Sequence, residues 1–109
     1  SLKNIYNNAE YIFNYNKMSE EFQFTPNGQE IKIINTLLAK LEINKSINKD
    51  AVKKIIDEVI KENKIKFKEF GQPVRMCLIC SSKGPSITDI ICSIGLDETI
   101  IRLKKYINN

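Results

Sequence analysis

Apolar residues recur at helical spacing in the middle of the chain. Between residues 51 and 60, apolar pairs return every four positions, with Lys, Asp and Glu between them. The pairs are Ala51-Val52, Ile55-Ile56 and Val59-Ile60. A period near 3.6 residues places these pairs on one side of a helix. The stretch therefore predicts an amphipathic helix with one buried face.

Two earlier stretches follow the same rule. Residues 2 to about 15 predict a first helix, with apolar positions at Leu2, Ile5, Tyr6, Ala9, Ile12 and Phe13. A second helix is predicted by the stripe Ile31, Ile34, Leu37, Leu38 and Leu41. We expect Thr25-Pro26 to cap and begin this second helix, although Gly28 would weaken its first turn. Asn48 or Ser46 is expected to cap the helix that follows.

Residues 64–68, with the sequence KIKFK, alternate between lysine and apolar residues. A period of two is also typical of a β-strand. A single strand of this length would have no partner in an otherwise helical chain. We therefore predict a loop or a short helical turn here.

Pro and Gly divide the second half of the chain. We predict that Pro73 occupies the first position of a helix running to about Cys80, because its missing N–H would be unpaired there anyway. The cluster at residues 81–85 predicts a turn. Ser86, with Asp89 three residues later, fits a capping box at the start of the next helix.

The last helix is predicted from its boundaries and its spacing. Gly95 should end the preceding helix, since glycine most easily takes the left-handed conformation. Asp97 should cap the last helix, with Glu98 in its first turn. Its apolar positions are Leu96, Ile100, Leu103 and Ile107. Together the patterns predict one all-α domain, residues 1–109, built as a compact bundle of about six short helices.

Composition narrows the class of protein. The chain of 109 residues is 42% hydrophobic and 28% charged, which suits one small folded domain. A formal net charge of +4 is a mild basic bias, compatible with nucleic acid. The absence of histidine removes the commonest general base and metal ligand. No apolar run is long enough to predict a membrane span. Because the first residue is Ser rather than Met, we expect a piece excised from a longer protein.

Cys77 and Cys80 form a C-x-x-C pair, a spacing found in zinc and redox sites. A zinc site needs about four ligands, and here Cys92 is the one further cysteine. Buried free cysteines behave as small apolar residues. We therefore predict a structural role for the pair. The odd number of cysteines indicates a reducing, cytosolic setting.

The order of motifs after residue 70 resembles a known family. Residues 71–75 (GQPVR), 83–87 (KGPSI), 94–95 (IG) and 100–103 (IIRL) are similar to the C-terminal end of bacterial glutamyl-tRNA synthetases. The close match covers about a third of the chain, and residues 2–70 resemble the family's preceding helices more loosely. The resemblance implies the helical C-terminal anticodon-binding subdomain of a class I synthetase.

The same resemblance implies a function. The parent enzyme would be a cytoplasmic monomer that joins glutamate to tRNA(Glu) with ATP and Mg²⁺. This chain would hold the anticodon loop of tRNA(Glu). It would carry no active site and need no cofactor or metal of its own.

Arg75 is the first candidate for contact with RNA. At 100° per residue it lies about a quarter-turn off the apolar face of its helix, and its guanidinium offers a planar fork of donors. The residues alone favour an ion pair with a surface carboxylate. The resemblance implies instead that Arg75 contacts the anticodon.

The loop at residues 83–87 is the second candidate, since it leads directly into a helix N-terminus, which favours anions. The resemblance implies that Gly84, Pro85 and Ile87 meet anticodon nucleotides, and we expect Lys83 and Gln72 to contact phosphate or RNA. A purely structural turn remains the alternative from the residues alone.

Two neighbouring features are less specific. Lys64, Lys66 and Lys68 could extend a phosphate-facing surface, although a solvated lysine face is the more frequent explanation. The family often has Thr-Gly where this chain has Ile79-Cys80, which puts a backbone contact at that point in doubt.

Two other functions fit part of the pattern. A helical protein-interaction module without RNA binding would explain the apolar stripes equally well, but not the order of motifs after residue 70. A thiol or zinc module would rest on the C-x-x-C pair. RNA binding with a steep dependence on salt would separate the first interpretation from both.

Overall fold

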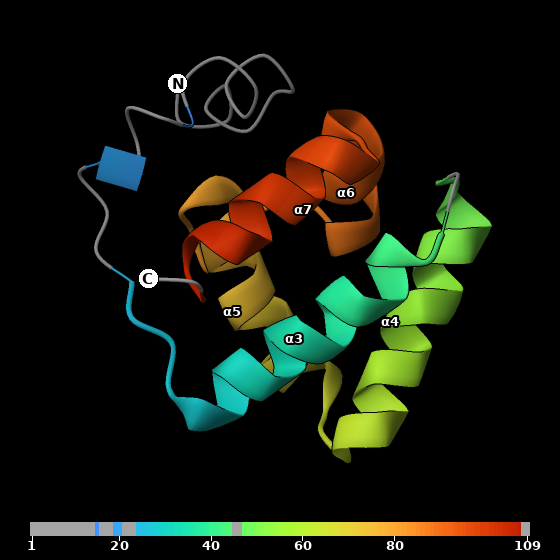
Figure 1. Ribbon diagram of the computed structural model, residues 1–109, viewed down its shortest axis with the longest axis horizontal. Coiled ribbons are helices and arrows are strands. Elements are labelled where there is room, and N and C mark those ends of the chain that lie inside the picture. Colours follow the sequence, from blue (N-terminus) through green and yellow to red (C-terminus); the bar gives the residue numbers. More distant parts are fainter. Residues whose placement is uncertain (1–14, 16–18, 21–23, 45–46, 108–109) are drawn as a thin grey trace.

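The computed structural model describes residues 15, 19–20, 24–44 and 47–107 of the chain (Figure 1). Its helices are α3 (Gly28–Glu42), α4 (Lys49–Asn63), α5 (Phe67–Ile79), α6 (Ile87–Ile94) and α7 (Leu96–Lys105). The described part contains no strand, so the all-α prediction is confirmed there. It holds five helices, slightly fewer than the six expected. Apart from Tyr15, the predicted first helix lies outside the described residues.

The five helices pack around one core. Helix α3 packs against α4, α5 and α7, while α6 packs against α4, α5 and α7. In Figure 1, α3 crosses the front of the molecule, with α4 on its right and α5 behind it. Helix α6 thereby contacts both α4 and α5, which precede it in the sequence. None of the described helices is both long and apolar enough to cross a membrane.

The predicted apolar stripes form this core. Those of α3 and α4 are buried at Ile34, Leu37, Leu38 and Leu41 and at Val52, Ile55, Ile56 and Val59. In α7, Leu103 is fully buried and Leu96 and Ile100 pack against the core, as does Ile107 in the turn that follows the helix. Ile31 is only half-buried, whereas the neighbouring Ile33 is 1% exposed. At 100° per residue, Ile33 lies about 90° from the centre of the other four positions and Ile31 about 70°, so helical spacing alone did not predict this difference.

Helix α3 begins two residues later than predicted. Asn27, not Thr25-Pro26, is the N-cap, and its side chain accepts from the Glu30 N–H at 2.8 Å. The Glu30 carboxylate accepts from the Asn27 N–H at 2.9 Å. Asn caps at least as well as Thr, and Glu30 completes the capping box. The next helix, α4, is capped by Asn48, one of the two residues expected.

The prediction that Pro73 begins a helix is wrong. Helix α5 begins at Phe67 and runs through Pro73. Residues 64–66 link it to α4, so the stretch 64–68 is not a strand. An interior proline costs about 3 kcal/mol, but each fully buried large side chain stabilises by about 1.5–3 kcal/mol. Because Phe70, Val74 and Leu78 are all fully buried on the two sides of Pro73, packing outweighs the lost hydrogen bond.

Helices α6 and α7 are separated by Gly95 alone. Gly95 has a φ of 89° and ends α6, as predicted, and it is also the residue preceding α7. The prediction that Asp97 caps α7 is therefore wrong, because Asp97 lies within the first turn. The carbonyl of Gly95 accepts from the Thr99 N–H at 3.0 Å and from its hydroxyl at 2.7 Å.

Candidate nucleic-acid interface

Arg75 lies against the turn that precedes α6. Its Nε donates to the Pro85 carbonyl oxygen at 3.1 Å, and the side chain is half-buried. The structure therefore brings the first two predicted candidates together. Arg75 takes part in none of the ion pairs formed by the described residues, which excludes the surface ion pair within that part of the chain. An arginine has five N–H donors, so four remain beyond the one that binds Pro85.

Gly71 makes room for the Arg75 guanidinium. A Cβ atom at Gly71 would lie 3.1 Å from Arg75 Nη1, closer than almost all real contacts of that kind. It would also lie 3.6 Å from Ile87 Cδ1 and 3.7 Å from Phe67 Cε2, which are ordinary contacts. Gly71 is itself buried. The guanidinium therefore rests on bare helix backbone one turn before its own residue.

The turn at residues 81–85 is held by hydrogen bonds of its own. Ser81 Oγ accepts from the Lys83 N–H at 3.1 Å and donates to the Lys83 carbonyl at 2.8 Å. Gly84 has a φ of 149°, which residues with a side chain rarely adopt. Lys83 and Gly84 are exposed and Pro85 is half-buried. Solvent therefore reaches the backbone of Gly84 and the ammonium of Lys83.

Helix α6 begins directly after this turn. Ser86 is its N-cap and accepts from the Asp89 N–H at 3.1 Å, which confirms the predicted cap. Helix geometry leaves the N–H groups of Ile87 and Thr88 without partners within the helix. The Asp89 carboxylate in the same turn lies 3.7 Å from the Lys49 ammonium. The negative charge of Asp89 would therefore repel a phosphate bound at this N-terminus.

Ile87 needs a correction, because its side chain is only 1% exposed and belongs to the core. It cannot touch a nucleotide through its side chain. Its backbone N–H, at the start of α6, is the group left for such a contact. In α6, Ile87, Ile90 and Ile91 follow one another at steps of three and four residues, and this spacing was the signal that Ile87 faces inward.

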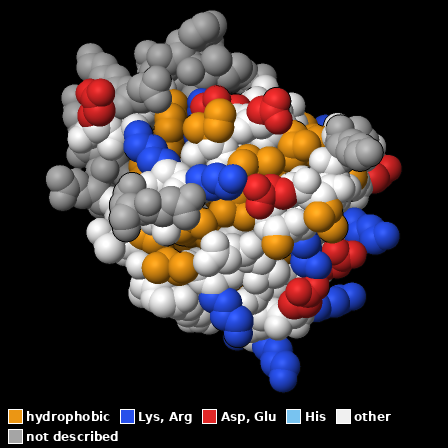
Figure 2. Space-filling view, viewed as in Figure 1, with side chains coloured by type: hydrophobic (Ala, Val, Ile, Leu, Met, Phe, Trp, Pro, Cys, Tyr) orange, Lys and Arg blue, Asp and Glu red, His pale blue; other side chains and the backbone are white. Residues whose placement is uncertain are grey.

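Gln72 and the lysines before α5 are exposed. Gln72 lies on α5, three residues before Arg75, and Lys64, Lys66 and Lys68 are all exposed around the start of that helix. On the face drawn in Figure 2, basic and acidic side chains are interspersed at the edge occupied by α4. Basic charge on that edge is therefore mixed with acidic charge rather than gathered in one patch.

The two thiols of the C-x-x-C pair are not activated for reaction. Burial raises the pKa of the Cys77 thiol to about 12, and burial also raises the pKa of Cys80. Both thiols are therefore protonated near neutral pH. Among the described residues, no group of three or more His, Cys, Asp or Glu side chains could hold a metal ion.

Cys80 instead ends α5 in a left-handed conformation, with φ 57° and ψ 33°. Its N–H donates to the Met76 carbonyl at 3.1 Å. Glycine is the residue best suited to this position. The family often has glycine at this position, and the backbone conformation is one that glycine favours. Cysteine adopts the same conformation here at some energetic cost.

Arg102 is a structural residue whose role the sequence reasoning missed. It is 1% exposed, and its Nε donates to Glu98 Oε2 at 2.8 Å. Its Nη1 donates to the Leu78 carbonyl at 2.8 Å, and its guanidinium carbon lies 4.0 Å from the centre of the Tyr15 ring. Arg102 thus secures the end of α5, from which the turn at residues 81–85 departs. The Glu98–Arg102 spacing of four residues was the available signal.

Comparison with known proteins shows the family to which the chain belongs. The family described as the anticodon binding domain matches residues 1–107. The glutamate–tRNA ligase of Pelagibacter ubique is 35% identical over 104 residues, which cover 94% of this chain and 22% of that protein. The glutamate–tRNA ligase of Staphylococcus xylosus is 32% identical over 91 residues, covering 83% of this chain and 76% of that sequence. Glutamate–tRNA ligase 1 of Sulfurimonas denitrificans is 33% identical over 78 residues, which cover 71% of this chain and 17% of that protein.

No solved structure matches the chain. The chain spans only about a fifth of the length of the first of these relatives. The match nevertheless extends over nearly all of its own residues, including both the turn at residues 81–85 and Arg75. The chain therefore belongs to the anticodon-binding domain family, in the form that glutamate–tRNA ligases carry.

Proposed function

We propose that this domain binds tRNA(Glu) through its anticodon loop, as part of a glutamate–tRNA ligase that charges the tRNA for protein synthesis. The observation that carries the proposal is the bond between Arg75 Nε and the Pro85 carbonyl. It joins a guanidinium and an exposed backbone turn in one surface. Unstacked RNA bases are recognised through stacking and through hydrogen bonds to their edges, and this surface supplies donors for such bonds.

The residues divide the work by their chemistry. Arg75 is held at Nε, so its remaining donors are pre-oriented towards a base edge or a phosphate. Gly84 and Pro85 present a stiff backbone turn, and Ile87 contributes only its N–H. Lys83 is a mobile point charge suited to phosphate, and the exposed Gln72 amide can reach either kind of group.

ATP and Mg²⁺ belong to the proposed activity of the whole ligase rather than to this domain. The described residues offer no group of three metal-ligating side chains. We expect activation of glutamate by this chain alone to stay at background in a pyrophosphate-exchange measurement. We expect the ligase to act as a monomer in the cytoplasm. No observation specifically favours the alternative of a protein-interaction module.

The test is binding of a synthetic anticodon stem-loop of tRNA(Glu), followed by aminoacylation with anticodon-substituted tRNAs in the whole ligase. Arg75→Ala should weaken binding by about 1–3 kcal/mol and relax preference at one nucleotide. Lys83→Ala should weaken binding to all sequences alike and reduce the salt slope by about 1. Lys32→Ala, an exposed lysine of α3, is the matched control for loss of one positive charge. If Arg75→Ala and Lys83→Ala both behave like the control, the proposed surface is wrong.

A further inference from the structure

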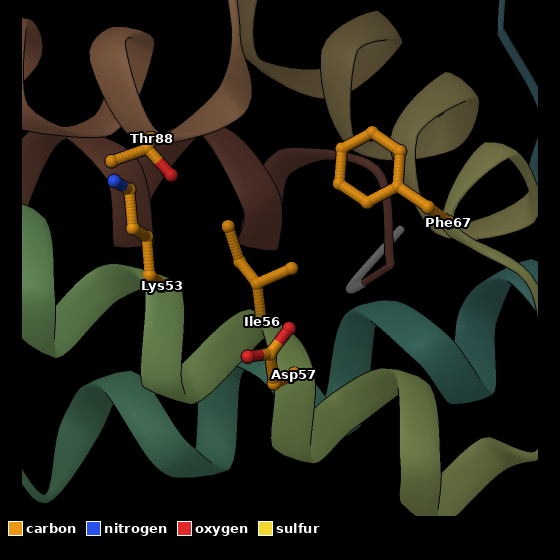
Figure 3. A pocket seen from close by; sticks show the side chains of 5 residues that line it. All are labelled: Lys53, Ile56, Asp57, Phe67 and Thr88. Carbon is orange, nitrogen blue, oxygen red and sulfur yellow. The ribbon is translucent and has the colours of Figure 1, made fainter.

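An open hollow lies between α4, α5 and α6, beside the Arg75 surface. Lys53, Ile56 and Asp57 of α4, Phe67 of α5 and Thr88 of α6 line it (Figure 3). Its volume is about 190 Å³. Pockets that enclose a drug-sized ligand measure roughly 300–1,000 Å³. The hollow is therefore too small to enclose a nucleotide, but it can receive a flat group lying partly in solvent.

Phe67 forms an aromatic wall of this hollow. It is 51% exposed, one of three large hydrophobic residues in the described part with a strongly exposed side chain. The ring centre of Phe67 lies 6.2 Å from that of the fully buried Phe70, so the exposed ring has an aromatic neighbour in the core. Figure 3 shows the ring beside the space above Ile56, which is itself buried. An exposed ring held in this way can stack with a planar group.

The polar groups around the ring include both charges. Lys53 supplies an ammonium donor, Asp57 a carboxylate acceptor and Thr88 a hydroxyl that does both. Neither Lys53 nor Asp57 takes part in the ion pairs formed by the described residues. A phosphate would be repelled by Asp57. A nucleobase presents donors and acceptors together on its edge, so it matches this set.

The hollow is continuous with the surface that carries Arg75. Phe67, Gly71 and Arg75 are spaced four residues apart on α5, and a Cβ at Gly71 would contact both Phe67 Cε2 and Arg75 Nη1. Thr88, on the hollow's opposite wall, follows the turn bonded to Arg75 by three residues. The exposed Lys66 and Lys68 flank Phe67 in the sequence and can attract the RNA backbone.

We propose that this hollow receives one unpaired base of the tRNA loop, stacked on Phe67, next to the nucleotide held by Arg75. The inference rests on the proposed function and adds a second base contact to it. Base–aromatic stacking tolerates any base, so this contact would add affinity more than sequence preference.

Tryptophan fluorescence gives a direct test. The chain contains no tryptophan, so Phe67→Trp introduces a single indole in the hollow. Ile101→Trp places the matched control on α7, at a residue that is 61% exposed and does not line the hollow. Both variants of the 109-residue chain are titrated with the anticodon stem-loop of tRNA(Glu), while anisotropy of labelled RNA reports binding independently.

We expect RNA to quench the indole at residue 67 and shield it from acrylamide, and to leave the indole at residue 101 unchanged. Replacing one loop nucleotide by an abasic site should abolish the quenching, although its phosphate remains. Phe67→Leu should raise the dissociation constant at least about fivefold, whereas Phe67→Tyr should stay close to the unmodified chain.

Four results would overturn the inference. If RNA binds but the indole at residue 67 does not respond, the hollow takes no base and the proposed function still stands. If the abasic series never affects the quenching, the hollow responds to phosphate rather than to a base. If the unmodified chain shows no anisotropy change, both the proposed function and the inference fail. Emission at residue 67 that changes with protein concentration alone would instead mark a protein contact.

Discussion

Gly71→Ala should separate RNA binding from stability, because it should weaken RNA binding while leaving stability nearly unchanged. The added methyl group would lie 3.1 Å from Arg75 Nη1 and must push the guanidinium by a few tenths of an ångström. The Arg75 Nε–Pro85 bond already measures 3.1 Å, so the shift stretches it towards the limit of a useful hydrogen bond. Loss of that bond costs about 0.5–1.5 kcal/mol of folding stability.

Two gains oppose this loss. Alanine is favoured over glycine in a helix interior by about 0.8–1.0 kcal/mol. The new methyl group is buried against Ile87 and Phe67 at ordinary distances, which is worth up to about 0.8 kcal/mol. Adding these terms gives a net change in unfolding free energy of about −0.7 to +1.3 kcal/mol, with a midpoint of about +0.3 kcal/mol, so stability is expected to change little. RNA affinity should nevertheless fall about fivefold or more, because Arg75 loses its anchored orientation.

The measurement pairs thermal unfolding with titration of the anticodon stem-loop. Gly28→Ala is the matched control, since it is the same change at a helical glycine with nothing within 4 Å of the new Cβ. It should leave RNA affinity unchanged. If Gly71→Ala keeps full affinity, the orientation of Arg75 does not matter for binding, and the reasoning that ties Gly71 to recognition is wrong.

Other predictions concern the elements that support this surface. Cys80→Gly should raise the unfolding free energy by about 0.5–1 kcal/mol in urea titrations, because it relieves the left-handed cysteine, whereas Cys80→Ala should give no such gain. Asn48→Ala should cost about 1 kcal/mol by removing the 2.8 Å bond to the Ala51 N–H; an unchanged midpoint would show that this cap is dispensable. Because burial raises the pKa of Cys77 from 9.0 to about 12, the folded state favours the protonated thiol. Its contribution is complete below pH 9.0 and is lost as pH rises towards 12, so Cys77→Ala should make unfolding less sensitive to pH across that window.

The sequence alone was sufficient to predict features that depend on residues within one helix or at its ends. The stripes of α3 and α4, the caps at Asn48 and Ser86, and the stop at Gly95 all depend on local spacing and local hydrogen bonds. These features need little knowledge of what the rest of the chain packs against.

The errors arose where tertiary packing overrides a local rule. Ile87 stands in a motif associated with RNA contact, but the core takes its side chain. Arg102 carries a charge that normally predicts exposure, yet its bonds to Glu98 and the Leu78 carbonyl permit full burial. A buried charge of this kind needs complete pairing. The four-residue spacing indicates Glu98 as one partner, but no local pattern indicates the Leu78 carbonyl.

The course of α5 through Pro73 has a consequence for the proposed RNA-binding surface. Had the helix begun at Pro73, Phe67 and Gly71 would have belonged to an irregular segment with no fixed relation to Arg75. Because the helix begins at Phe67, these three residues lie four apart on one face, with the bare backbone of Gly71 between a ring and a guanidinium. The buried side chains of α5 offset the cost of the interior proline. They therefore also keep Phe67, the proposed stacking residue, in line with Arg75. A variant that shortens α5 from its N-terminus should lose Phe67 from this line while leaving the Arg75–Pro85 bond intact.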